Sequence, residues 1–204
     1  MTLTLFIIIL TAITSITAFN NREVFYKLKF HPSSMSNGKE LYRFLSHALL
    51  HADWMHLLIN MFVLYSFGTL VESMFGMMFG KKAMLFFGLL YVLGAICSSI
   101  PSFFKHRNNY AYSAVGASGA VSAILFASIL IYPQGSISFM FLPIPIPAWL
   151  FGILYLVYSA YMSKKNIDNV GHDAHFWGAV FGIVFTAILN PALLTGFIQN
   201  ITNS

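Results

Sequence analysis

The chain has 204 residues, of which 58% are hydrophobic and 8% are charged, and its net charge is +5. The charged fraction is about a third of that of an ordinary soluble domain, so the composition predicts a membrane protein. The Lys and Arg residues are spread over polar stretches without a basic stripe, which argues against a nucleic-acid partner. Cys97 is the only cysteine, so these residues form neither a disulfide among themselves nor a Cys-based zinc site.

Apolar segments long enough to cross a bilayer alternate with short polar stretches along the whole chain. The polar stretches are too short to hold a soluble domain, so we predict a single domain over residues 1–204, an all-α membrane protein built as a six-transmembrane-helix bundle. The first segment resembles a secretory signal, but no Lys or Arg precedes it, and we expect it to be retained as a helix. The expected helices are approximately 3–19, 53–72, 83–101, 114–132, 147–162 and 172–194.

Polar side chains inside spanning segments are costly and therefore mark candidate functional sites. The second segment carries His56 and Asn60, which are four residues apart and would share one face of a helix. The fourth segment carries Ser118, and the sixth carries His175. Hydrogen bonding between helices is the alternative role for His56 and Asn60.

His56, Ser118 and His175 each lie near the start of an even-numbered segment. With six crossings, these starts all reach the same membrane face, and each residue lies about one to two helical turns below it. We therefore expect the three side chains to meet at a depth that water can reach.

Glycines accompany both the serine and the histidine. Gly116 and Gly119 flank Ser118, and Gly178 and Gly182 form a small-xxx-small face one turn beyond His175. Such faces let helix backbones approach closely, so the glycines predict packing between the fourth and sixth segments.

A serine becomes a nucleophile when a neighbouring base takes its proton, and a neutral imidazole is suited to that role near pH 7. Attack on an amide carbonyl leaves negative charge on oxygen, which His56, the Asn60 amide and the backbone N–H of Ser118 can stabilise. The pattern therefore predicts amide hydrolysis by Ser118 and His175 within the membrane boundary.

Three motifs in this order, "HALLHADWMHLLIN", "GASG" and "AHFWGAVFG", resemble those of the rhomboid intramembrane serine proteases. The resemblance covers about Tyr42 to Gly182. It implies Ser118 as the nucleophile, His175 as the general base, and His56 and Asn60 as the side chains that stabilise the oxyanion.

The resemblance also implies the setting of the reaction. Substrates would be transmembrane proteins that enter from the surrounding lipid, cut in or beside their spanning segments, with no metal and no organic cofactor. Residues 20–52 would fold into the membrane interface, and the chain would be a multi-pass protein of a bacterial cytoplasmic (inner) membrane.

The sequence departs from the family pattern at two positions. Tyr42 precedes Arg43 where many members have tryptophan, and Ser122 stands where many have an aromatic residue against the catalytic histidine. What orients His175 is therefore left open. The resemblance also implies that residues 163–173 lie over the site. We expect the "PIPIP" stretch at 143–147 to be a stiff connector on the opposite face.

The same residues allow alternative roles and functions. His172 competes with His175 as the base, and Asp173 can complete a triad only from a nearly opposite side of the helix. His47 and His51 suggest a metal site but more often form structural hydrogen bonds. A catalytically silent membrane-protein binding factor of the same fold, or a small transporter or channel, would be the competing function.

The two signals for orientation disagree. Nine of the eleven Lys and Arg residues lie in the stretches on the active-site face, and the positive-inside rule would place that face in the cytoplasm. The family resemblance expects the opposite in bacteria. We favour the family orientation, because the first loop is about 30 residues long and expected to be structured.

Overall fold

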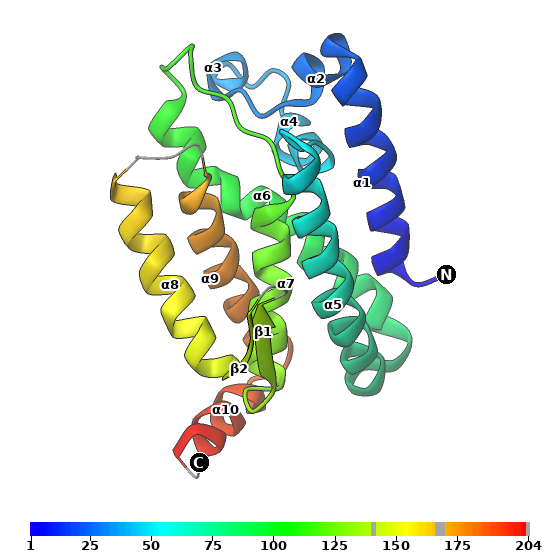
Figure 1. Cartoon of the computed structure of the whole chain (residues 1–204), viewed down its shortest axis with the longest axis vertical. Coiled ribbons are helices and arrows are strands. Elements are labelled where there is room, and N and C mark those ends of the chain that lie inside the picture. Colours follow the sequence, from blue (N-terminus) through cyan, green and yellow to red (C-terminus); the bar gives the residue numbers. More distant parts are fainter. Residues whose placement is uncertain (140–141, 166–169, 203–204) are drawn as a thin grey trace.

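The computed structural model describes residues 1–139, 142–165 and 170–202. It is a helical bundle with a layer of short helices at one end, which we call the interfacial layer after its predicted location, and a β-hairpin at the other (Figure 1). Six longer helices lie in the predicted segments: α1 Leu3–Asn20, α5 Trp54–Phe79, α6 Ala83–His106, α7 Ser118–Ile131, α8 Ala148–Lys165 and α9 His172–Leu189. The shorter elements are α2 Arg22–Leu28, α3 Pro32–Met35, α4 Arg43–Ser46, η1 His47–Leu49, η2 Gly80–Lys82, β1 Ser136–Phe139, β2 Leu142–Pro147 and α10 Ala192–Thr202.

Three described segments are long and apolar enough to cross a membrane: Leu3–Asn20, Trp54–His106 and His172–Leu189. The second contains both α5 and α6, joined by η2. Helix α7 is apolar but has only 14 residues, or about 21 Å, which is shorter than a bilayer core of about 30 Å. The helical membrane fold is therefore confirmed, and the number of six crossings stays a prediction.

Helix α7 lies at the centre of the bundle, and all its residues from Gly119 to Leu130 are buried. It packs most extensively against α9 and also against α5 and α6. Small residues make these approaches possible: a side chain at Gly178 would meet the Gly119 backbone, and one at Gly182 would meet the Ala123 backbone. Close helix packing of this kind is typical of membrane proteins, where lipid gives no hydrophobic force between helices.

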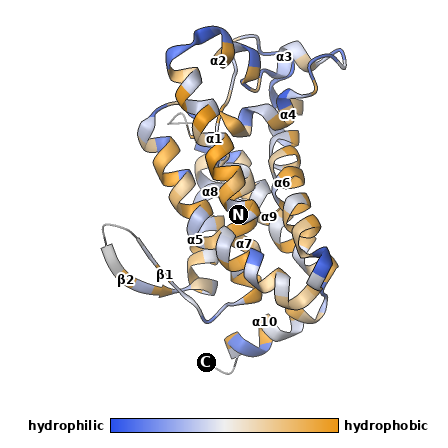
Figure 2. Cartoon of the chain, turned by 90° about the vertical axis from the view of Figure 1, so that its right-hand side faces the viewer, coloured by the Kyte–Doolittle hydropathy of each residue, from blue (hydrophilic) through white to orange (hydrophobic). Residues whose placement is uncertain are grey.

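Helix α1 buries small residues and exposes large ones. Thr4, Thr11 and Ser15 are fully buried, whereas Phe6 and Ile13 on the outer face are 47% and 61% exposed. This pattern is typical of a helix that packs through its small residues and turns bulky apolar side chains toward lipid. Figure 2 shows that apolar residues predominate along the helices.

Glu72 of α5 accepts hydrogen bonds from the backbone N–H groups of Leu3 and Thr4 and from the Thr4 hydroxyl, at 2.7–3.0 Å. A carboxylate at the positive end of a helix satisfies backbone donors that have no partner within the helix.

Residues 20–52 form an ordered layer of short helices, and Arg43 holds it together. The Arg43 side chain is 9% exposed. Its guanidinium donates to the Glu40 carboxylate and to the carbonyl oxygens of Tyr26 and Lys29. The Tyr42 hydroxyl donates to the Lys27 carbonyl at 3.0 Å, so Tyr42 is also anchored in the layer.

Residues 143–147, predicted as a stiff connector on the opposite face, belong to β2, which pairs antiparallel with β1. Ile137 lies opposite Ile146 and Ser136 opposite Pro147. A two-stranded hairpin has only edge strands, and a proline without an N–H is tolerated where its nitrogen faces away from the partner. The hairpin lies at the end of the bundle that also carries α10 (Figure 1).

Candidate active site

The starts of α5, α7 and α9 bring the predicted site residues to the same end of the bundle. His56 is the third residue of α5, Ser118 the first of α7 and His175 the fourth of α9. All three are half-buried. This end also carries the interfacial layer of α2, α3 and α4 (Figure 1).

Gly116 brings His56 next to the serine. Its φ of +130° lies in the region that strongly favours glycine. A Cβ atom added there would lie 2.8 Å from His56 Cε1 and 3.8 Å from Ser118 Oγ. The imidazole and the hydroxyl therefore both lie next to the position that a side chain at residue 116 would occupy.

The starts of α7 and α9 are also in contact. A Cβ atom on Gly119 would lie 3.5 Å from the carbonyl oxygen of Ala174, so the neighbours of Ser118 and His175 meet in the chain's fold. Gly178, one turn beyond Ala174 on α9, lies against the backbone of Gly119. The glycines therefore set the spacing between the helices that carry the serine and the histidine.

His47 and His51 of the interfacial layer form hydrogen bonds with the backbone that leads into α7. The His47 carbonyl accepts from the N–H of Gly116 at 3.0 Å, and the Ala117 N–H points to His51 Nε2 at 3.5 Å. Because the Ser15 hydroxyl donates to the Leu49 carbonyl, it accepts from His51 Nδ1 at 3.0 Å. His51 therefore forms structural hydrogen bonds, as expected from the sequence.

Burial keeps these two imidazoles neutral. His47 and His51 are 6% and 0% exposed. Desolvation lowers the pKa of His47 to about 4. Desolvation, with a smaller contribution from His56, lowers the pKa of His51 to about 3. Both residues precede the start of α5. Within the described residues, no three His, Cys, Asp or Glu side chains are grouped closely enough to hold a metal ion.

His56 and Asn60 are coupled within α5. The Asn60 amide donates to the His56 carbonyl at 2.9 Å, and Asn60 is 6% exposed. The N–H of Ala52 points to His56 Nδ1 at 3.5 Å, which favours the tautomer with its proton on Nε2. Since Nε2 would lie 3.0 Å from a Cβ atom on Gly116, this tautomer places an N–H donor beside Gly116.

The acidic neighbour of His175 has another partner. The Asp173 carboxylate accepts from Lys105 at the end of α6, at 3.0 Å. This ion pair argues against Asp173 as the third member of a triad. His172 is 5% exposed, and its ring lies 5.8 Å from that of His175 and 5.5 Å from that of Tyr158.

Sequence reasoning missed a residue beside His175. The Tyr155 ring of α8 lies 6.2 Å from the His175 ring, and its hydroxyl lies 2.7 Å from Ser122 Oγ. No motif pointed to Tyr155, because it is one of many aromatic residues in an apolar segment. The stretch predicted to cover the site, residues 163–173, includes 166–169, which lie outside the described residues.

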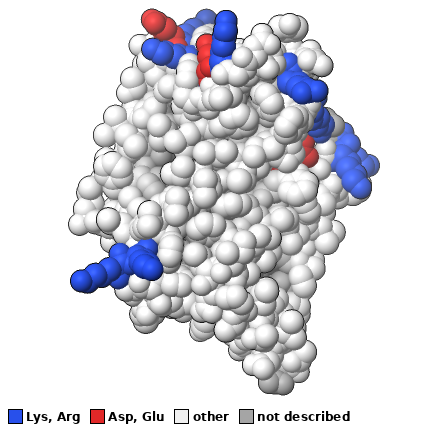
Figure 3. Space-filling model, turned by 180° about the vertical axis from the view of Figure 1, so that it is seen from behind, with Lys and Arg blue, Asp and Glu red and all other residues white. Residues whose placement is uncertain are grey.

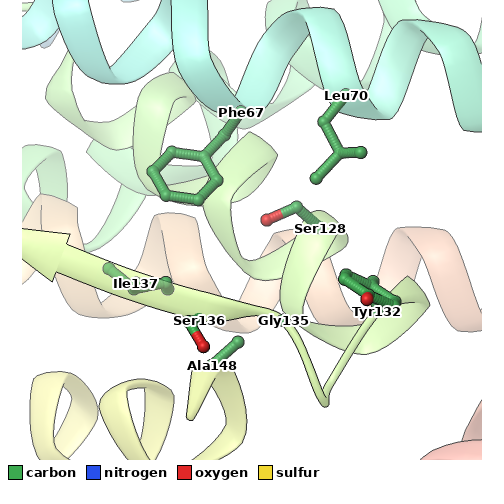
Figure 4. A pocket seen from close by; sticks show the side chains of 8 residues that line it. All are labelled: Phe67, Leu70, Ser128, Tyr132, Gly135, Ser136, Ile137 and Ala148. Atoms are coloured by element: carbon green, nitrogen blue, oxygen red, sulfur yellow. The ribbon is translucent and has the colours of Figure 1, made fainter. Parts of the chain in front are cut away.

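A cavity of about 170 Å³ lies away from this site, between α5, α7 and the first strand of the hairpin (Figure 4). Ser128 in its wall lies ten residues beyond Ser118, or about 15 Å along α7, and donates to the Leu125 carbonyl. The cavity is therefore separate from the catalytic candidates. It is lined by Phe67, Leu70, Ser128, Tyr132, Gly135, Ser136, Ile137 and Ala148.

Comparison with known proteins gives the family. The model of the Rhomboid domain matches residues 38–192. The chain is 28% identical to RHOMBOID-like protein 12, mitochondrial, of Arabidopsis thaliana, over 81% of this chain and 51% of that protein. It is 28% identical to Rhomboid protein 1, mitochondrial, of Saccharomyces cerevisiae, over 72% of this chain and 41% of that protein.

A bacterial relative is also similar. The chain is 31% identical to Rhomboid protease GluP of Bacillus subtilis, over 87% of this chain and 35% of that protein. The chain therefore spans about half or less of the length of these relatives. The matched domain covers most of the chain, and together with the apolar helical bundle it identifies an integral membrane protein that belongs to the rhomboid family.

Proposed function

We propose that this chain is a serine-type endopeptidase that hydrolyses peptide bonds in or beside transmembrane segments of other membrane proteins. Ser118 is the nucleophile and His175 the general base. His56, Asn60 and the backbone N–H of Ser118 stabilise the oxyanion. The relative from Bacillus subtilis is named a protease, which supports this proposal.

The observation that carries the proposal is the arrangement around Ser118. The His56 ring and the Ser118 hydroxyl both border the position that a side chain at residue 116 would occupy, and the start of α9 lies against Gly119 on α7. Three polar positions that are far apart in sequence thus share one end of an otherwise apolar bundle. A packing role for each residue separately would not require them to meet at that end.

The mechanism follows from these positions. Ser118 Oγ attacks the carbonyl carbon of the substrate while His175 takes the hydroxyl proton. The carbonyl oxygen becomes negative and accepts hydrogen bonds from His56 Nε2, the Asn60 amide and the Ser118 N–H. Ser118 begins α7, so its N–H has no partner within the helix and lies at the positive end of the helix dipole.

Collapse of the intermediate breaks the peptide bond and completes the first half of the reaction. His175 returns its proton to the leaving amine, and the acyl group remains on Ser118 Oγ. A water molecule then gives a proton to His175 and attacks the acyl carbon. Release of the new carboxyl end restores the serine hydroxyl.

The substrate must lose helical structure before it is cut, because helical backbone keeps its carbonyl groups in internal hydrogen bonds. Lateral entry of a single spanning segment from lipid suits a site one to two turns below the membrane surface. Two of the relatives are named mitochondrial and one comes from Bacillus subtilis. These names support a membrane location without singling out the bacterial cytoplasmic membrane.

The test compares purified wild-type protein with Ser118→Ala and His175→Ala in lipid, on a panel of single-span test substrates. We expect cleavage by the wild type and none above background by either variant. Equal cleavage by all three would contradict the assignment of Ser118 and His175. Folded wild-type protein that cuts no substrate would favour a catalytically silent binding factor, and ion flux through it would favour a channel.

A further inference from the structure

The aromatic neighbour of His175 comes from α8, whereas the family resemblance led us to expect it on α7. Ser122 lies one turn after Ser118 on α7 and is 3% exposed. The family resemblance expects an aromatic side chain at this position, against the catalytic histidine. In this chain the Ser122 hydroxyl instead lies 2.7 Å from the hydroxyl of Tyr155, on α8. The ring beside His175 therefore comes from α8, and it is hydrogen-bonded to a buried hydroxyl on α7.

Several contacts fix the Tyr155 ring. Besides the hydrogen bond to Ser122, it packs against the rings of Phe126 and Phe151, at 5.4 and 5.9 Å between centroids. On its other side it lies 6.2 Å from the His175 ring, with 31° between the planes. Aromatic pairs at such distances are mutually oriented, so the geometry restricts the imidazole on the side that faces α8.

We propose that Tyr155, held by Ser122, is a positioning residue for His175. This inference rests on the proposed protease function. A general base must keep its acceptor nitrogen within hydrogen-bond reach of the hydroxyl, and a ring held at both its face and its hydroxyl limits imidazole rotation. Tyr155 touches neither substrate nor reacting atoms, so its loss should slow the chemical step without weakening substrate binding.

The hydrogen bond is tested by a double-mutant cycle of Tyr155→Phe, Ser122→Ala and the double variant. Each single variant removes the same hydrogen bond and keeps the ring of residue 155. We expect kcat to fall by about two- to tenfold in each. The double variant should be no slower than the slower single variant, because the second change has nothing further to remove.

The ring is tested by Tyr155→Leu, with Tyr161→Leu as the matched control. Tyr161 lies on the same helix but is 56% exposed. We expect Tyr155→Leu to lower kcat by about tenfold or more with KM changed less than twofold, and to slow labelling of Ser118 by a fluorophosphonate. Tyr161→Leu should keep both rates within twofold of the wild type.

Thermal unfolding of every variant separates positioning from folding. If Tyr155→Leu unfolds, the conservative variants Tyr155→Phe and Ser122→Ala still decide the role of the hydrogen bond. Multiplying losses in the double variant, a loss confined to KM, or equal rates for the two leucine variants would each overturn the proposal. Wild-type protein without cleavage, or cleavage that survives Ser118→Ala, would instead refute the proposed function on which it rests.

Discussion

At the scale of single residues, Gly116 has little freedom to change. Its φ of +130° is strained for any residue with a side chain, and an added Cβ would meet the His56 ring at 2.8–3.0 Å. Backbone strain of this kind costs about 1–3 kcal/mol. The fold at this point therefore depends on the absence of one methyl group.

We accordingly expect Gly116→Ala to lower the cleavage rate at least tenfold, since relief of the contact displaces His56 from the serine. The matched control is Gly76→Ala in α5, where an added Cβ meets nothing within 4 Å, and which should keep full activity. Initial cleavage rates and thermal unfolding of both variants check this. An active Gly116→Ala protein would show that the His56 position is not needed.

The buried histidines of the interfacial layer predict a loss of stability in acid. The unfolded chain protonates His47 and His51 below the ordinary pKa of 6.5, whereas the folded chain keeps them neutral down to about 4 and about 3. The unfolded state thus binds more protons, and the free energy of unfolding falls as pH drops from 6.5 toward 4.

Measurement of the unfolding temperature between pH 7 and pH 4 tests this expectation. Each depressed histidine contributes up to about 1.4 kcal/mol per pH unit in that window. The variant His47→Phe, whose ring can pack beside Phe30 as the imidazole does at 5.3 Å, should show a shallower decline. A stability that is constant over the window would contradict burial of neutral imidazoles.

At the scale of helices, the contact between α7 and α9 sets the site. Gly182 lies against the Ala123 backbone, so a methyl group there has no flexible side chain to displace. Overpacking of a close contact typically costs about 1–3 kcal/mol. The helix axes must separate to relieve it, and Ser118 and His175 lie on these two helices.

Gly182→Ala should therefore lower the unfolding temperature by several degrees and reduce cleavage, although residue 182 is nearly two turns from His175. Gly196→Ala in α10 is the control, because a Cβ at that position meets nothing within 4 Å. Thermal unfolding and cleavage rates of the two variants in the same lipid provide the comparison. Equal behaviour of both would mean that α7 and α9 can separate without affecting the site.

At the scale of the whole molecule, the charges lie at the ends of the bundle. Figure 3 shows Lys and Arg side chains around the end with the interfacial layer and a separate basic group nearer the other end. Helix α6, from Ala83 to His106, has 24 residues, or about 36 Å, enough to cross a bilayer. Lys82 and Arg107, both exposed, flank this helix.

We expect cysteines at these two positions to react with a membrane-impermeant maleimide from opposite sides. The protein carries Cys97→Ser together with either Lys82→Cys or Arg107→Cys, in sealed vesicles or cells. Reaction of both from one side would contradict the crossing. Labelling of Arg107→Cys from outside would favour the family orientation, and labelling from the cytoplasm would favour the distribution of Lys and Arg.

The sequence by itself determined the membrane class, the helical segments and the placement of His56, Ser118 and His175 near one end. Hydropathy and helical rise are local properties, and the parity of the crossings follows from them. Helix ends were less certain: α5 continues to Phe79, beyond the expected residue 72, because Gly80 rather than the loss of hydropathy ends it.

Only the tertiary structure decided the contacts that give the site its shape. The pair of Ser122 and Tyr155, the bonds from His51 to Ser15 and Ala117, and the contact of Gly116 with His56 join residues that are far apart in the chain. Periodicity places a residue on a face of its own helix, but the facing residue depends on how the helices rotate and pack together. The sequence therefore shows that residue 122 is not aromatic, but it does not show which residue faces His175. In the fold that residue is Tyr155 of α8.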